Sequence, residues 1–179
     1  ALMFAAQYGG EHAAGMMRTL LSVGADTNRQ DEDGWTALMV AAHYGGAHGA
    51  GMIRLLIDAG ADTNRQDEEG WTALMWAAKY GGEHAEPMMR VLLGAGAAAN
   101  KQNDNGRTAL MIAAWKGGEH AAGMMKVLLE HGGHVAVNKQ EEDGRTALML
   151  AARYGGEHAA KMMRLLVDAG ADANMQEED

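Results

Sequence analysis

The tripeptide Ala-Leu-Met recurs along the chain, and this repetition constrains the fold more than any other feature of the sequence. Its copies begin at Ala1, Ala37, Ala73, Ala109 and Ala147, so the starts are 36, 36, 36 and 38 residues apart. A period of this length indicates a stack of similar units, each of which buries its apolar face against its neighbours. The repeats that follow fill the chain without a linker or a second domain: 1–36, 37–72, 73–108, 109–146 and 147–179.

One unit, residues 31–66, shows how each copy should fold. It opens with acidic turn residues that end in Gly34, which can take a positive φ. Thr36 is a suitable N-cap for a first helix over residues 37–44, which a glycine pair ends. A second helix carries the apolar residues Met52, Ile53, Leu55, Leu56 and Ile57. Gly60 stands where a helix commonly has its C′ glycine. The sequence therefore predicts two helices per copy and ten in all, with no sheet beyond the turn tips.

The start of the second helix is inferred from the only proline, Pro87 in the third copy. Proline is tolerated at the first position of a helix but not in its interior. We therefore expect the second helix of this copy to begin near position 87, with residues 81–86 as the connector.

The order of these motifs resembles the ankyrin repeat. The run GWTALMVAA, a glycine turn, LLIDAGADTN and an acidic turn follow one another as in that family, and all five copies match. The resemblance implies an all-α, ankyrin-type helical repeat solenoid of five stacked helix–turn–helix units. It also implies a concave face, lined by turn tips and first helices, that binds another protein.

This sequence departs from the family pattern in three ways. The family has Thr-Pro-Leu-His at the first helix, whereas this chain has Thr-Ala-Leu-Met, which places methionine at the histidine position in Met39, Met75, Met111 and Met149. The connector between the helices is three residues longer than in the family unit. The fourth copy has two further residues around 131–134. We interpret all three departures as variations within the fold.

Positions that differ between copies are the candidates for partner binding. One such position follows the turn glycine and another pair ends the first helix. By resemblance these would face the partner, with Trp35 and Trp71 side by side at the centre and both side chains substantially exposed, because tryptophan, tyrosine and arginine are enriched in interface hot spots. The alternative is that the tryptophans pack along adjacent turns and that each tyrosine closes a helix end. The predicted partner-binding residues are Trp35, Trp71, Arg107, Arg145, His43, Tyr44, Lys79, Tyr80, Trp115, Lys116 and Arg153.

A ladder of histidines recurs in every copy, at His12, His48, His84, His120 and His158. Equivalent helices of neighbouring repeats should lie about 8–10 Å apart, which is too far for two ladder members to share a metal ion. No second ligand follows at a metal-binding spacing within a copy. We expect the ladder to be structural, with each imidazole holding its connector against the next one, and we expect no metal and no cofactor.

The composition narrows the classes of function. A formal net charge of −9 disfavours nucleic acid as a partner. The absence of cysteine excludes a disulfide framework and favours an intracellular compartment, as does the lack of a basic signal-peptide start. No apolar stretch approaches the length of a membrane span. The paired methionines, such as Met88-Met89, occupy positions where core residues are expected.

These observations favour a protein–protein interaction module or scaffold whose acidic turn tips select a partner with basic residues. The alternative is a structural array that stacks end to end into a filament or serves as a spacer. No nucleophile–base pair or metal cluster indicates an enzyme. We also expect the chain to be part of a longer array or to associate through its ends, leaving apolar surface exposed at Leu2, Phe4 and Leu20 and at Met162, Leu165 and Leu166.

Overall fold

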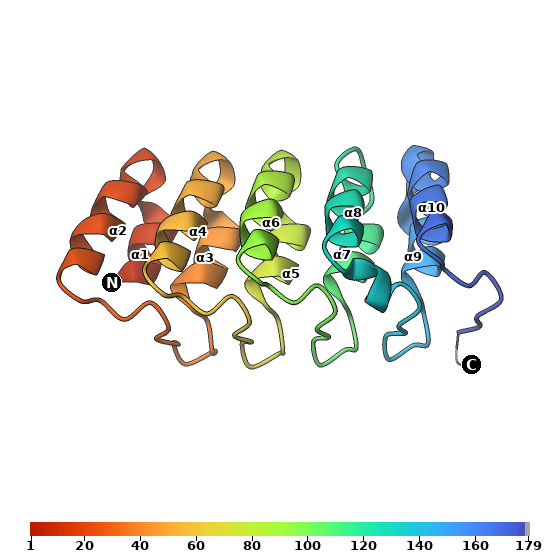
Figure 1. Ribbon diagram of the computed structural model, residues 1–179, viewed down its shortest axis with the longest axis horizontal. Helices are drawn as coiled ribbons and strands as arrows, with labels where there is room; N and C mark the ends of the chain where they lie inside the picture. The colour runs from red at the N-terminus through yellow and green to blue at the C-terminus, as the bar shows by residue number, and fades with distance from the viewer. Residues whose placement is uncertain (178–179) are drawn as a thin grey trace. The chain divides into compact units, whose positions relative to one another are not determined.

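A computed structural model describes residues 1–177, and over these residues it contains ten α-helices and no β-strand, two helices for each copy, as predicted (Figure 1). The chain forms two compact units, residues 1–98 and 99–179. The first unit contains α1 (Leu2–Tyr8), α2 (Ala13–Ser22), α3 (Ala37–Tyr44), α4 (Gly49–Asp58), α5 (Ala73–Tyr80) and α6 (Ala85–Gly94). The second contains α7 (Ala109–Lys116), α8 (Ala121–Glu130), α9 (Ala147–Tyr154) and α10 (Ala159–Asp168). That the five copies form one continuous array stays a prediction.

The first helix of each copy after the first begins at a threonine cap, as the sequence indicates. The backbone of Thr36 is extended, and its hydroxyl accepts a hydrogen bond of 3.3 Å from the Met39 N–H. The Sδ atom of Met39 in turn accepts the N–H of Thr36 at 3.4 Å. Thr108 and Met111 repeat both contacts. In these two copies the methionine that replaces the family's histidine therefore satisfies a donor at the helix start.

The second helices begin earlier than predicted. Helix α6 starts at Ala85, so the expectation of a start near position 87 is wrong by two residues. Pro87 lies in the first turn, where a backbone N–H would have no partner within the helix, so the missing donor costs nothing there. The connector before α6 is a short 3₁₀ helix, η3 (Gly82–His84). His84 occupies the N-cap position without a side-chain capping bond.

Within each unit the helices form two layers. In the first unit α2, α4 and α6 lie in one layer, with α1, α3 and α5 behind them (Figure 1). Apolar side chains between the layers are almost completely buried, including Met17, Leu38, Ile53, Leu56, Leu74, Met88, Met89 and Leu92 in the first unit and Leu110, Met111, Met125 and Leu128 in the second. Most paired methionines are therefore core residues, as expected, although Met16 is exposed.

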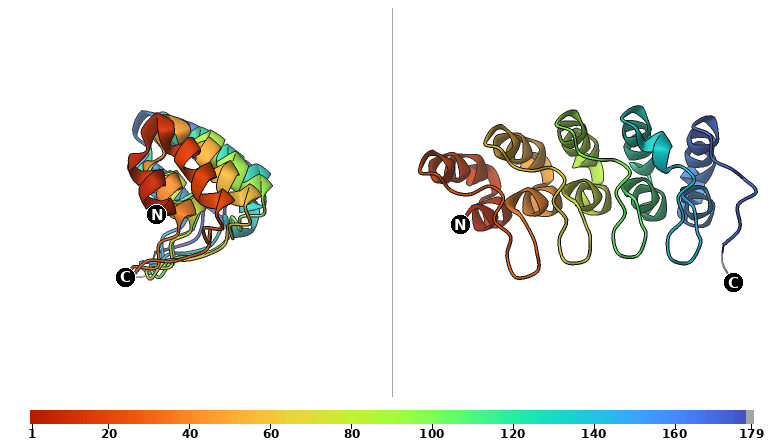
Figure 2. Two further views of the ribbon diagram at one scale, coloured as in Figure 1. Left: turned by 90° about the vertical axis from the view of Figure 1, so that its left-hand side faces the viewer. Right: turned by 60° about the horizontal axis from the view of Figure 1, so that its bottom comes forward.

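The turns between copies project from one end of the helix layers (Figure 2) and are joined by side-chain amides. Gln30 Nε2 donates to the carbonyl of Gly34 in its own turn and to that of Gln66 in the next copy. Asn28 Nδ2 donates to the Gly60 carbonyl, while its Oδ1 accepts the Asp62 N–H. In the second unit Gln102, Gln140 and Asn138 make the equivalent bonds. These amide bridges hold successive turns of a unit at a fixed spacing.

The insertion in the fourth copy changes this pattern locally. Residues 133–136 form a 3₁₀ helix, η4 (Gly133–Ala136), and His131 Nδ1 lies 2.8 Å from the Val127 carbonyl. Lys139, which follows η4, donates from Nζ to the carbonyl of Asn100 in the preceding copy. The insertion is therefore accommodated within the fold, as the sequence suggested.

The expected apolar surface at the two ends is only partly present. Phe4 is 68% exposed, and Leu20 and Leu165 are partly exposed. Leu2, Met162 and Leu166 are buried, so the expectation is wrong for them. They are covered because α1 packs on α2 and α3, and α10 packs on α8 and α9. Each described helix falls short of what spanning a bilayer requires.

Candidate partner-binding site

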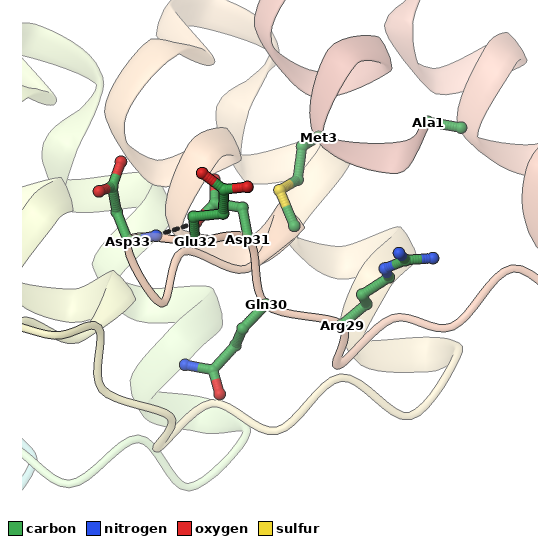
Figure 3. A pocket seen from close by; sticks show the side chains of 7 residues that line it. All are labelled: Ala1, Met3, Arg29, Gln30, Asp31, Glu32 and Asp33. Atoms are coloured by element: carbon green, nitrogen blue, oxygen red, sulfur yellow. Dashed lines mark hydrogen bonds between the residues drawn. The ribbon is translucent and has the colours of Figure 1, made fainter.

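When each turn is counted with the helix pair that follows it, the turn tip of the second copy, which precedes α3, is a cluster of carboxylates that faces solvent. Asp31, Glu32 and Asp33 are exposed, and Asp31 Oδ1 accepts the N–H groups of Asp33 and Trp35. Figure 3 shows this tip beside Ala1 and Met3 of the first copy, where a cavity of about 790 Å³ lies between them. The short aspartate at position 31 thus closes the turn while its neighbours direct their charges outward.

The two predicted central tryptophans differ in exposure and are separated by a third. Trp71 is only 7% exposed, so the expectation of a substantially exposed side chain is wrong for this residue, whereas Trp35 is half-buried. The ring of Trp76 lies between them, with its centroid 4.5 Å from that of Trp35 and 4.6 Å from that of Trp71. The pair expected side by side is therefore a stack of three indoles, which buries the last ring.

His43 lies at the centre of an aromatic cluster at the ends of α3 and α5. Its ring centroid is 3.9 Å from that of Tyr44 and 4.0 Å from that of Tyr80. Trp35 and Trp76 contact the same imidazole at 5.6 and 5.3 Å. We call Trp35, His43, Tyr44, Trp76 and Tyr80 the aromatic surface of the first unit. Tyr44 and Tyr80 are 49% and 46% exposed, so both rings are available to a partner.

Lys79 adds a cation to the edge of this surface. Its Nζ atom lies 4.5 Å from the centroid of Trp71 and 5.0 Å from that of Tyr80, which are cation–π distances. Burial, followed by the positive charge of Lys79, lowers the pKa of His43 below its ordinary value. His43 Nδ1 is buried without a hydrogen-bond partner among the described residues. The cluster therefore favours the neutral imidazole.

Asp67 connects the turn tip of the third copy, which precedes α5, to the aromatic surface. Its Oδ1 accepts the Trp71 N–H at 2.8 Å, and its Oδ2 accepts the Trp76 Nε1–H at 3.0 Å. Burial raises the pKa of Asp67, although these hydrogen bonds oppose the shift. The sequence did not reveal this role of Trp76. The indication in the sequence was the size of the Trp76 side chain, because the same position holds the smaller Val40, Ile112 and Leu150 in other copies.

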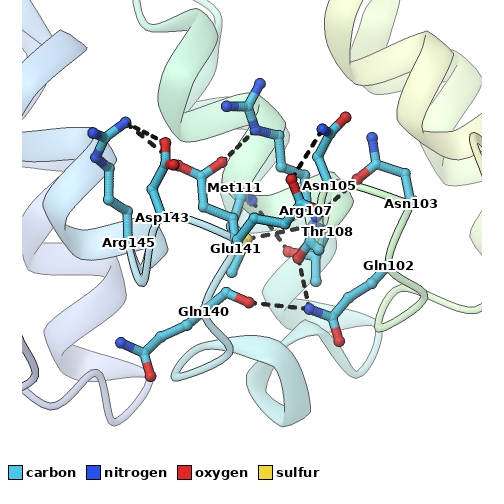
Figure 4. Close-up of polar contacts among 12 residues, drawn as sticks. Gln102, Asn103, Asn105, Arg107, Thr108, Met111, Gln140, Glu141, Asp143 and Arg145 are labelled. Atoms are coloured by element: carbon cyan, nitrogen blue, oxygen red, sulfur yellow. Dashed lines mark hydrogen bonds and ion pairs between the residues drawn. The ribbon is translucent and has the colours of Figure 1, made fainter. Parts of the chain in front are cut away.

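In the second unit the predicted binding residues Arg107 and Arg145 are ion-paired within the chain (Figure 4). Arg107 Nε donates to Oε2 of Glu141, whose side chain is 1% exposed. Arg145 lies 3.8 Å from Glu141, 3.0 Å from Asp143 and 2.9 Å from Glu177. The hydrogen bond with Glu177 is the main cause that raises the pKa of Arg145. The two guanidinium groups therefore serve as links between turns.

The other predicted residues of the second unit are more exposed. Trp115 is partly exposed beneath the Arg107 guanidinium at 6.0 Å, and Lys116 faces solvent. Arg153 lies over the ring of Tyr154 at 5.5 Å. In each of the second, third and fourth copies, the residue after the turn glycine contacts the residue near the end of the first helix: Trp35 with His43, Trp71 with Lys79, and Arg107 with Trp115. The two variable positions thus form one surface in each copy.

The histidine ladder lies on the connectors, away from these residues. His12, His84 and His158 each contact the glutamate that precedes them, at 3.4, 3.5 and 3.5 Å. The polar partner is thus within the same connector, whereas we expected the next one. No group of three or more metal-ligating side chains exists among the described residues.

Stacked helix pairs, projecting turns and a variable surface on an invariant framework define a helical repeat protein. Residues 2–93 and 82–177 match the family described as ankyrin repeats (3 copies), and together these matches cover nearly the whole chain. The chain belongs to the ankyrin repeat family. Proteins of this family are generally protein–protein interaction modules and are typically not enzymes. No curated protein is significantly similar in sequence to the chain.

Proposed function

We propose that the chain is a scaffold that binds a partner protein through the aromatic surface of its first unit. The observation that carries this proposal is the exposure of Tyr44 and Tyr80 around an imidazole that contacts both rings. Tyrosine and tryptophan supply large contact area with few rotatable bonds, and they dominate the energy of many interfaces. Here the rings already pack on one another, so binding immobilises little that is free beforehand.

The charges around the aromatic surface indicate the class of partner. Turn tips of the second and third copies carry Asp31, Glu32, Asp33, Asp67, Glu68 and Glu69. Such a cluster attracts basic residues and speeds their association, and salt screens the effect. The proposed partner is therefore a protein with lysine or arginine residues at its contact surface, bound on the face that the family resemblance identifies as concave.

A capture experiment with matched variants tests the proposal. Wild-type protein and the double variant Tyr44→Ala/Tyr80→Ala are immobilised, and the proteins they retain from a cell lysate are compared by quantitative mass spectrometry. The control is Tyr154→Ala, which removes the residue at the same repeat position in the second unit. A partner retained by wild type and the control but lost by the double variant supports the proposal. Equal retention by all three proteins contradicts it.

A second candidate, self-association, is favoured by an apolar groove on the first copy. Phe4 and Tyr8 are exposed and stacked 6.0 Å apart, and with Met16 and Leu20 they line a cavity of about 710 Å³. Exposed apolar area of this kind marks an interaction site. Sedimentation velocity over a range of concentrations tests it. Association that disappears in Phe4→Ser supports this candidate, whereas a constant monomer mass contradicts it.

A further inference from the structure

A second feature of the first unit is a cavity of about 330 Å³ between two turn tips. Two indole rings and four carboxyl side chains line it: Asp33, Trp35, Asp67, Glu68, Glu69 and Trp76. We call it the acidic aromatic pocket. Asp33 and Trp35 come from the tip of the second copy, the other carboxylates come from the tip of the third, and Trp76 projects from α5.

The pocket has the charge and the walls of a cation site. Among the residues that the structure describes, no lysine or arginine forms an ion pair with any of its four carboxylates. Indole faces attract cations through their quadrupole, and the Lys79 ammonium already lies 5.4 Å from the centroid of Trp76. Asp67 is held in place by its bonds to Trp71 and Trp76, so its charge does not move when a ligand enters.

The second unit shows which cation fits this position. There Arg107 occupies the repeat position of Trp35, and Glu141 occupies that of Asp67. The Arg107 guanidinium binds the buried Glu141 carboxylate directly (Figure 4). The chain itself thus supplies a guanidinium at the site equivalent to the pocket. In the first unit a tryptophan replaces that arginine and the carboxylate is kept.

We propose that the acidic aromatic pocket binds the guanidinium group of an arginine side chain. This inference rests on the proposed function, because the partner protein would carry that arginine. A guanidinium is planar, so it stacks on an indole while its N–H groups bond to carboxylates at its edge. An ammonium group cannot do both in the same way, because it presents no flat face. Arginine is therefore favoured over lysine.

A titration with small ligands tests the pocket without the partner. Protein labelled with ¹⁵N is titrated with N-acetylarginine amide, N-acetyllysine amide and N-acetylalanine amide at constant ionic strength, and the tryptophan indole resonances are followed by NMR. We expect saturable shifts of Trp35 and Trp76 with the arginine amide, at a dissociation constant in the millimolar range. Binding of the lysine amide should be several-fold weaker, and the alanine amide should cause no shift. Equal binding of the lysine amide, or shifts that never saturate, overturns the proposal.

Charge-removing variants locate the binding in the pocket. Asp33→Asn/Glu68→Gln/Glu69→Gln removes three pocket charges without changing side-chain shape, and it should weaken binding of the arginine amide about tenfold. Asp58→Asn/Glu83→Gln/Glu86→Gln removes the same charge from helices and connectors of the same unit and should leave the affinity unchanged. Equal weakening of arginine-amide binding in both variants would overturn the proposed site, because the loss would then follow from the net charge of the protein rather than from the pocket.

A further variant fills the pocket from within. Trp35→Arg places at position 35 the residue that the fourth copy has at 107, so its own guanidinium should bind Asp67 and exclude the ligand. We expect this variant to keep the thermal unfolding midpoint of the wild type and to lose binding of the arginine amide. Unchanged binding would overturn the proposal. These titrations use small molecules and no partner protein. If they fail, the pocket proposal fails, whereas partner binding by the aromatic surface is tested by the capture experiment.

Discussion

The indole N–H of Trp76 donates a 3.0 Å hydrogen bond to the carboxylate of Asp67, which joins a helix to the turn nine residues before it. Asp67 is only 8% exposed. A buried carboxylate is costly unless its oxygens accept hydrogen bonds, and here the backbone of Trp71 and the ring of Trp76 supply them. The same bond fixes the ring on which Trp35 stacks.

Replacement of Trp76 by phenylalanine should therefore destabilise the first unit. Trp76→Phe keeps an aromatic ring but removes the donor to Asp67, and an unsatisfied buried acceptor costs about 1–3 kcal/mol. Urea unfolding measures the loss. The control is Trp115→Phe, because Trp115 is partly exposed and its indole nitrogen makes no hydrogen bond among the described residues. Equal stability of the two variants would show that the Asp67 bond contributes little.

The titration of His43 should respond to Lys79. Its pKa is lowered in the folded protein, so its contribution to stability is complete above the unfolded-state value of 6.5. That contribution is lost as the pH falls from 6.5 through the lower pKa of the folded state. Lys79→Met should raise the pKa of His43 towards 6.5, but not to it, since burial is the larger cause. Proton NMR of the His43 ring measures the midpoint, with Arg18→Met as a charge-matched control. An unchanged midpoint in Lys79→Met would exclude the electrostatic contribution.

Loss of the Glu141 charge should destabilise the second unit. Glu141→Gln leaves the guanidinium groups of Arg107 and Arg145 without the buried anion between them, and hydrogen bonds to charged groups contribute about 1.5–3 kcal/mol. We expect a loss of about 2 kcal/mol in chemical denaturation. Glu142→Gln alters the exposed neighbour and should change stability by less than about 0.5 kcal/mol. If both variants unfold at the same denaturant concentration, the ion pairs are not stabilising.

Substitutions of Trp71 and Trp35 should have different effects, the first mainly on stability and the second mainly on partner binding. Trp71→Ala removes a buried ring and should lower the free energy of unfolding by about 3–5 kcal/mol. Trp35→Ala removes a half-buried ring and should destabilise less while weakening capture of the partner. Thermal unfolding and partner affinity are measured on both variants. A larger loss of stability in Trp35→Ala than in Trp71→Ala would reverse these roles.

Much of the fold follows directly from the sequence, because it depends on local signals that recur. The threonine caps, the glycine with φ +78° at Gly34 and the helix pair in each copy were all predictable from residue type and period. The start of α6 was not, since Pro87 is compatible with any position in the first helical turn. Boundaries of this kind depend on the connector as well as on the proline.

The side-chain arrangement of the site was harder to predict, because it depends on contacts between copies. Nothing local to Trp76 reveals that its ring separates Trp35 from Trp71. The ion pairs did leave a signal: Arg107 and Arg145 are each followed in the next copy by a glutamate, at Glu141 and Glu177. The copies with tryptophan are instead followed by the shorter Asp67 and Asn103.

The amide bridges between turns have an evolutionary consequence. Gln30 and Asn28 join neighbouring copies mostly through backbone groups, and the partners of Gln102 and Asn138 are of the same kind. Hydrogen bonds to main-chain atoms do not depend on which side chains lie beside them. Duplication or recombination of one copy in the gene therefore preserves the amide bridges, while the residues at positions 35 and 43 and their equivalents can diverge. Binding specificity in such a protein can change one repeat at a time while the fold stays the same.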